Sequence, residues 1–196
     1  MNIYDALRKR KSTRAFLDKP VSREKLVNIL RAARHAPSGT NAQPWQVAVV
    51  TGRKKDELAK AMTEAFKKDG IGTMDYQYYP QNWKEPYKKR RVSCGAQLYS
   101  ALNIERRDRA GRLRQWAANY RAFDAPVMLL FFMDGGMQTG SFMDYGMFIQ
   151  SIMLAAMEKG LATCPQASLA QYPDIVRSEL GYDDSMQVVC GMALGY

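Results

Sequence analysis

The stretch His35-Ala-Pro-Ser-Gly-Thr-Asn-Ala-Gln-Pro-Trp45 separates two segments of opposite character. Before it, apolar residues recur at helical spacing from Leu26 to Ala33, and after it an apolar, β-branched run extends from Gln46 to Thr51. This spacing predicts an amphipathic helix, and this run predicts a strand. The two prolines, the glycine and the short polar side chains between them suit a turn with free backbone N–H groups. We therefore expect a loop that offers hydrogen-bond donors to a flat ligand with a polar edge.

Outward from this loop, predicted helices alternate with apolar runs along the whole chain. Helices are expected over residues 2–8, 23–34 (with Ser22 as N-cap), 53–68, 87–102, 105–120, 142–159 and 173–180. Strands are expected over residues 46–51, 126–133, 161–164 and 186–194, and Pro165–Ser168 is interpreted as a loop. The run 126–133 is continuously apolar, which predicts a strand buried on both faces. Helices that flank several apolar strands indicate an α+β or α/β class.

Length and composition favour a single globular domain over residues 1–196. Hydrophobic residues make up 46% of the chain and charged residues 24%. The longest apolar run, Ala125–Met133, is shorter than the roughly 20 residues that a bilayer span needs. The N-terminus shows no secretory signal. We therefore expect a cytoplasmic protein without a membrane partner.

The cysteines and the single histidine argue against a disulfide framework or a zinc site. Cys94, Cys164 and Cys190 are odd in number and far apart, and His35 is the only histidine. We expect reduced thiols in a reducing compartment. Cys164 has no histidine nearby in sequence to activate it, so we interpret it as a buried structural thiol.

A formal net charge of +10 indicates an anionic partner, and composition alone leaves its nature open. One class is nucleic acid, because basic and aromatic residues alternate between Lys84 and Arg114. Glu85, Glu105 and Asp108 interrupt this run, and it matches no known nucleic-acid-binding module. A solvated helix face explains the run better, so we expect no nucleic-acid partner.

Three polar clusters could bind a phosphorylated, planar ligand. The first is Arg10-Lys11-Ser12-Thr13-Arg14, in which two arginines and a hydroxyl can bind a phosphate. The second comprises Pro37, Ser38, Gly39, Asn41 and Gln43 of the opening loop, and the third runs from Gly160 to Ala167. Taken singly, ordinary structure explains each one better: a solvated basic helix end, a plain connection between helix and strand, and a strand end.

Taken together, in their order and spacing, these clusters resemble the nitroreductase family of flavin enzymes. The resemblance covers nearly the whole chain. It also includes Asp144-Tyr145-Gly146 with Gln150, Gly160-Leu161 followed by Cys164-Pro165-Gln166, and the closing Gly191-Met192-Ala193-Leu194-Gly195-Tyr196. It implies an α+β fold with a central, mostly antiparallel sheet flanked by helices. It further implies an interlocked homodimer with FMN at two interface sites.

The resemblance also implies roles for individual residues. The expected FMN contacts are Arg10, Lys11 and Ser12 near the phosphate, Arg14 at the pyrimidine edge, Pro37, Ser38, Gly39 and Asn41 from the second subunit, Asp144 from the long helix, and Pro165, Gln166 and Ala167 along the ring. NADPH or NADH would give hydride to flavin N5, and a nitroaromatic, a quinone or a similar small acceptor would then take the electrons by a ping-pong mechanism. No side chain is expected to act as the catalytic acid.

Several alternatives stay open at this level. A specialised flavin reaction, such as reductive dehalogenation, would use the same cofactor motifs. A flavin-binding module without turnover is a further hypothesis, because similar proteins continue past the closing Gly-Tyr with an Arg-containing phosphate-binding tail, whereas this sequence stops at Tyr196. The excursion Gly70–Pro86, with Tyr76, Tyr78, Tyr79 and Trp83, is predicted either to shape the acceptor pocket as a lid or to be a plain surface loop.

Overall fold

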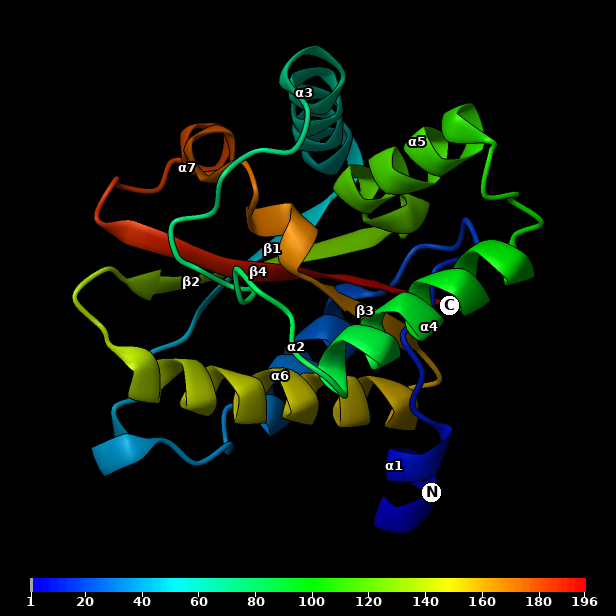
Figure 1. Ribbon diagram of the computed structural model, residues 1–196. Helices are drawn as coiled ribbons and strands as arrows, with labels where there is room; N and C mark the ends of the chain where they lie inside the picture. The colour runs from blue at the N-terminus through cyan, green and yellow to red at the C-terminus, as the bar shows by residue number, and fades with distance from the viewer. Residues whose placement is uncertain (1) are drawn as a thin grey trace.

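A four-stranded antiparallel sheet forms the centre of the computed structural model, which describes residues 2–196 (Figure 1). The spatial order of the strands is β1-β2-β4-β3, and all three neighbouring pairs are antiparallel. The strands are β1 (Gln46–Thr51), β2 (Val127–Asp134), β3 (Ala162–Gln166) and β4 (Met186–Gly195). The predicted α+β class with an antiparallel sheet is confirmed.

The two central strands, β2 and β4, are largely buried, and for β2 the sequence predicted this. Every residue of β2 from Val127 to Met133 is buried, and β4 is buried from Val188 onward. Such strands contact side chains on both faces of the sheet. Gly191 of β4 has no room for a side chain, because an added Cβ would lie 2.5 Å from Leu169 Cδ1 and 2.9 Å from the carbonyl oxygen of Leu129.

Helices cover both faces of the sheet (Figure 1). Beneath it in this view lie α2 and α6, whose Ile29, Phe148 and Ile152 pack against the lower face. Above it lie α3, α5, α7 and a 3₁₀ segment, η2, which contribute Leu58, Met62 and other core residues. The bounds are α2 (Arg23–Ala33), α3 (Gly52–Asp69), α5 (Arg109–Ala117), η2 (Ala118–Asp124), α6 (Thr139–Glu158) and α7 (Pro173–Leu180). Within residues 2–196 every helix is too short or too polar to span a bilayer.

Helix ends follow local capping chemistry. Asn2 caps α1 (Ile3–Lys9), since its Oδ1 accepts the Asp5 N–H at 2.8 Å, and the predicted cap Ser22 accepts the Lys25 N–H at 3.3 Å. Gly181 ends α7 in the left-handed conformation, with a φ of 70°.

Two predicted element boundaries were wrong. The helix expected from Glu105 begins only at Arg109, because the Asp108 carboxylate caps it by accepting the Gly111 N–H at 2.7 Å. The helix expected from Phe142 begins at Thr139. Capping by Asp108 leaves residues 104–107 free to form a turn beside the cleft described below.

The interpretation of Pro165–Ser168 as a loop was wrong for its first two residues. Pro165 and Gln166 belong to β3 and lie opposite Met192 and Gly191 of β4. Strand β3 is at the edge of the sheet, where a proline without an N–H can be accommodated. A helical turn, η3 (Ala167–Ala170), follows directly.

The excursion 70–86 contains no helix or strand, but it is fixed to the sheet. The carboxylate of Asp75 accepts hydrogen bonds from Arg177 at 2.7 Å and from the Val188 N–H at 2.9 Å. The Tyr76 hydroxyl donates to the carbonyl oxygen of Val189 at 2.5 Å, and its ring lies 4.6 Å from that of Phe142. The excursion is therefore a built part of the fold.

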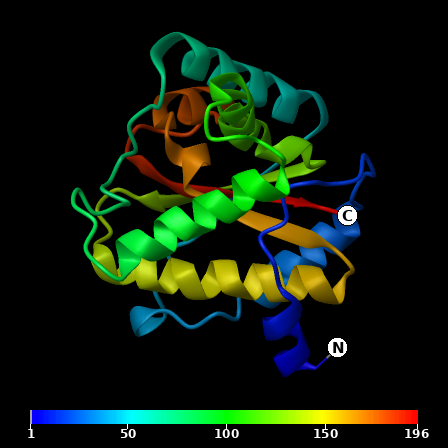
Figure 2. The same cartoon turned by 45° about the vertical axis from the view of Figure 1, so that its right-hand side comes forward.

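Helix α4 (Tyr87–Ala101) follows the excursion and crosses diagonally in front of the sheet (Figure 2). All of its residues lie in the described part of the chain, and all are half-buried or exposed. The helix consequently leaves space between itself and the sheet edge.

Candidate functional site

A cleft of about 880 Å³ lies between α4 and the end of β3. Its floor is Cys164–Ser168, and its walls come from α4, the turn that follows α4, α5 and η2. Apolar and aromatic walls include Leu98, Tyr99, Trp116 and Phe123. A space of this size and lining is typical of a small-molecule or cofactor site.

The floor of this cleft also borders a second cavity. Pro165, Gln166 and Ala167 line both the cleft and a cavity of about 660 Å³ that adjoins α6 and the excursion. Tyr76 and Phe142 are among the mostly apolar residues on the far side of that second cavity. The predicted ring-lining residues therefore form one platform at the end of β3.

The basic segment 10–14, which we call the basic strap, lies along β3 and reaches this platform. Ser12 forms a parallel bridge with Thr163, and the Thr13 N–H donates to the Thr163 carbonyl at 3.0 Å. Arg14 lines the cleft, with its guanidinium 5.8 Å from the ring centroid of Phe123. The fold thus brings together the first and third clusters, which are about 150 positions apart in the sequence.

Two arginines of this segment affect the thiol on the cleft floor. Burial raises the pKa of the Cys164 thiol above its ordinary value, while the positive charges of Arg14 and Arg10 act in the opposite direction. Burial prevails, so Cys164 stays a protonated thiol. Its side chain is 1% exposed, as expected for a structural cysteine.

Gln166 presents a buried oxygen without a partner on the floor. Its Nε2 donates to the backbone oxygen of Asn119 at 3.0 Å, and the Asn119 amide is oriented by its own hydrogen bond to the Trp116 carbonyl at 2.9 Å. The Oε1 of Gln166 has no hydrogen-bond partner among residues 2–196, although the residue is only 5% exposed. A buried acceptor of this kind calls for a donor from outside the chain.

Asn119 lines the cleft, and sequence analysis did not single it out. It lies in a short 3₁₀ segment that follows α5, in which Ala122, Phe123 and Asp124 all adopt left-handed backbone angles. This unusual backbone places Phe123 in the cleft wall. No periodic pattern predicts such a segment, so only the fold shows that it lies above Gln166.

The opening loop lies elsewhere in the same chain, below α6 in Figure 1. Pro37, Ser38, Gly39 and Asn41 line neither cavity. The Gly39 N–H donates to Asp144 Oδ1 at 3.1 Å, so Asp144 anchors this loop within its own chain.

Asp144 itself is 8% exposed and also lines neither cavity. Seven of the predicted site residues lie along the strap and platform, and the loop residues with Asp144 form a separate group. The predicted site residues are thus gathered into two places.

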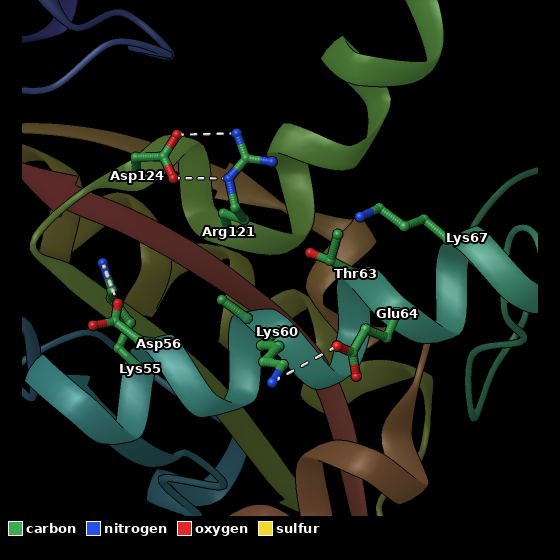
Figure 3. Close-up of a pocket in the computed structure, with 9 residues that line it drawn as sticks. Lys55, Asp56, Lys60, Thr63, Glu64, Lys67, Arg121 and Asp124 are labelled. Atoms are coloured by element: carbon green, nitrogen blue, oxygen red, sulfur yellow. Dashed lines mark hydrogen bonds and ion pairs between the residues drawn. The ribbon is translucent and has the colours of Figure 1, made fainter.

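A smaller hollow of about 320 Å³ lies between α3 and η2 (Figure 3). Its charges largely pair with one another: Arg121 and Asp124 form a two-pronged pair at 2.8 and 3.1 Å, and Lys60 lies 3.9 Å from Glu64. Self-paired charges leave little for a ligand, so the cleft beside β3 is the stronger candidate site.

Known proteins are similar to this chain in sequence and in fold over nearly its whole length. The model of the nitroreductase family matches residues 7–196. The nitrobenzene nitroreductase of Ectopseudomonas oleovorans is 43% identical over 195 residues, which cover 99% of this chain and 86% of that protein. The 4-nitrobenzoate reductase of Pseudomonas putida is 38% identical over 95% of this chain and 82% of its own length.

Solved structures agree with the sequence comparison. The FMN and NADPH-dependent nitroreductase NfnB from Sphigopyxis sp. strain HMH superposes with a TM-score of 0.95 at 41% identity, covering all of this chain and 88% of that one. The FMN-dependent NfnB from Mycobacterium smegmatis, solved in complex with NADPH, gives 0.93 at 33% identity over 98% of this chain and 86% of that one. The chain therefore belongs to the nitroreductase family.

Proposed function

We propose that this chain is an FMN-dependent oxidoreductase that uses NADPH or NADH to reduce nitroaromatics, quinones or similar electron-poor acceptors. The observation that carries the proposal is one cleft that joins Arg14 of the basic segment 10–14, the platform Pro165–Ala167 and the unpartnered buried Oε1 of Gln166. The names of the relatives support it, since those at 38–43% identity are reductases of nitrobenzene and nitrobenzoate.

The residues of the cleft fit FMN. The ligand needs cations for its phosphate, an apolar surface for its ring and polar partners at the ring edge. Arg10, Lys11 and Ser12 would bind the phosphate, and Pro165, Gln166 and Ala167 would hold the ring. The orphaned Oε1 of Gln166 supplies an acceptor for an N–H group of the ligand.

FMN bound in the cleft would supply hydride chemistry at N5. NAD(P)H and the acceptor would then occupy the same space in turn, and this sharing gives ping-pong kinetics. Arg14 places a permanent positive charge beside the platform and stabilises negative charge there. The side chains of Phe123 and Trp116 exclude water from the wall, and Asn119 keeps the Gln166 amide in one orientation. In this proposal no side chain of the chain acts as a nucleophile or a proton donor.

We further propose a homodimer in which each chain completes the other's site. Apolar side chains are exposed on α1 and on the first half of α6: Ile3 is 73% exposed, Tyr4 81% and Met143 69%. Exposed apolar surface of this kind marks a protein contact. The loop 37–41 lies beside the same part of α6, so a second copy seated there would receive its backbone donors.

The 196 residues are then one FMN-binding domain, and three free cysteines support a reducing, cytoplasmic location. The excursion 70–86 serves as a wall of the acceptor space, because Tyr76 and Tyr78 line the cavity behind the platform.

A visible absorbance spectrum of the purified protein tests the main proposal. The protein is mixed with FMN, desalted, and titrated anaerobically with NADPH and then nitrobenzene. We expect retained flavin that bleaches with NADPH and recovers its colour with nitrobenzene. Retained flavin that never bleaches would instead indicate a binding module, and absence of flavin from a folded protein would contradict the proposal.

A pair of matched variants connects this result to the cleft. Gln166→Ala removes the buried, unpartnered Oε1 from the cleft floor and is expected to weaken FMN retention several-fold, because the ligand loses that acceptor. Gln97→Ala, at an exposed position of α4 that does not line the cleft, should leave retention unchanged. Light scattering on the same samples tests the dimer, for which a monomeric mass would be contrary evidence.

A further inference from the structure

Several arginines line the cleft, one from α4, one from the turn after α4 and one from α5. Among the described residues that line it, Arg14, Arg91, Arg106 and Arg112 are cationic and only Glu105 is anionic. The cleft wall therefore carries a local charge of +3. The proposed FMN contacts use Arg14 and leave the other three arginines without a role.

Arg112 is held in place before any ligand arrives. Its guanidinium carbon lies 5.1 Å from the ring centroid of Tyr99, and its Nη1 donates to the backbone oxygen of Arg106 at 3.4 Å. Both contacts leave most of its N–H groups free. A stacked guanidinium loses less freedom when it binds an anion than an unrestrained side chain does.

Neither Arg106 nor Arg112 forms an ion pair within residues 2–196, whereas Arg121 and Arg177 elsewhere in the fold do. Arg106 and Arg112 both line the cleft, and like charges that share one cleft repel each other unless an anion lies between them. The charge-assisted hydrogen bonds that such groups make to phosphate are among the strongest in proteins.

The turn that carries Arg106 approaches Arg14 through Ile104. Arg14 and Ile104 line both the main cleft and a hollow of about 360 Å³ beside it, so the α4–α5 turn and the basic strap meet there. Tyr99 and Trp116 face the same cleft and offer surfaces on which a base can stack.

We propose that Arg106 and Arg112 form a subsite for a phosphate monoester of a nucleotide bound in the cleft. A monoester carries nearly two negative charges at neutral pH and matches two guanidinium groups better than a diester with one. The 2′-phosphate of NADPH, which NADH lacks, has this chemistry, whereas the 5′-phosphate of FMN is already assigned to Arg10, Lys11 and Ser12. The inference rests on the proposed function for the identity of the nucleotide.

The test compares Arg106→Gln and Arg112→Gln with Arg107→Gln, which removes the same charge from an exposed position outside the cleft. The KM values for NADPH and NADH and the Kd of FMN are measured for each FMN-loaded variant. For a 2′-phosphate contact, the KM for NADPH rises about tenfold or more while the KM for NADH changes less than twofold. A rise in the Kd of FMN by a similar factor, with both KM values unchanged, would mean that the pair binds the FMN phosphate and would overturn the inference.

A binding measurement separates failure of this inference from failure of the proposed function. Calorimetry with adenosine 2′,5′-bisphosphate and with adenosine 5′-monophosphate needs neither turnover nor a nitro substrate. Tighter binding of the bisphosphate that is lost in Arg112→Gln and kept in Arg107→Gln supports the 2′-phosphate source. If the cleft variants match Arg107→Gln in both KM values, in the Kd of FMN and in calorimetry, the subsite does not exist.

Discussion

Replacing Arg177 with methionine removes the cation that fixes the excursion 70–86 to the body of the protein. The Arg177 side chain is 8% exposed and donates to Asp75 at 2.7 Å, to the Met186 carbonyl at 3.1 Å and to Asp174 at 2.6 Å. Asp75 is 19% exposed and keeps only the Val188 N–H, at 2.9 Å, when the guanidinium is gone. A methionine of similar length fills the space without replacing the charge.

The expected loss in the free energy of unfolding follows from these exposures. Removing one partner of a fully buried ion pair costs about 3–5 kcal/mol. Water reaches part of the Asp75 carboxylate, which lowers that cost. Asp174 is 91% exposed and contributes about 0–1 kcal/mol. We therefore expect Arg177→Met to cost about 2–4 kcal/mol, well above an ordinary surface substitution.

Urea unfolding at a fixed protein concentration measures this loss, because a dimer's stability depends on concentration. Asp174→Asn is the control, with an expected cost of at most about 1 kcal/mol. The double variant Asp75→Asn with Arg177→Met should recover part of the loss, since no unpaired charge is left. A cost for Arg177→Met no larger than that of Asp174→Asn would refute the reasoning.

Two further predictions concern β4. Gly191→Ala is expected to destabilise the protein by roughly 2–4 kcal/mol in urea, because its Cβ meets the backbone oxygen of Leu129, whereas Gly140→Ala, which has open space, should change stability by less than about 1 kcal/mol. Burial raises the pKa of the Cys190 thiol to about 12, so the folded state keeps a proton that the unfolded state loses, and stability declines between about pH 9 and 12. Cys190→Ala should lessen that decline by up to about 1.4 kcal/mol per pH unit, and equal slopes for Cys190→Ala and the exposed Cys94→Ala would contradict this.

Most of the helices and strands, and the family, could be predicted from the sequence. Apolar spacing predicted α2 and α3, and the continuous apolar run predicted the buried strand β2. The caps Ser22 and Gly181 marked helix ends. These signals are local, because a helical period, a capping hydroxyl or a left-handed glycine acts within a few residues. The order of the polar motifs along the chain was enough to identify the nitroreductase family.

Which of these residues come into contact depends on the three-dimensional fold. The local sequence of Pro165 and Gln166 predicted a loop, but the structure pairs both residues with β4. A strand is stabilised by hydrogen bonds to a partner strand, and this partner lies farther along the chain. In the sequence, Asn119 and Arg112 look like ordinary residues of a polar helix. The fold of η2 and α5 against α4 places both of them around one cleft. The resemblance predicts a flavin contact for Asp144, and only the fold shows that this residue also anchors the loop 37–41. Such contacts join positions tens of residues apart, and no local pattern encodes them.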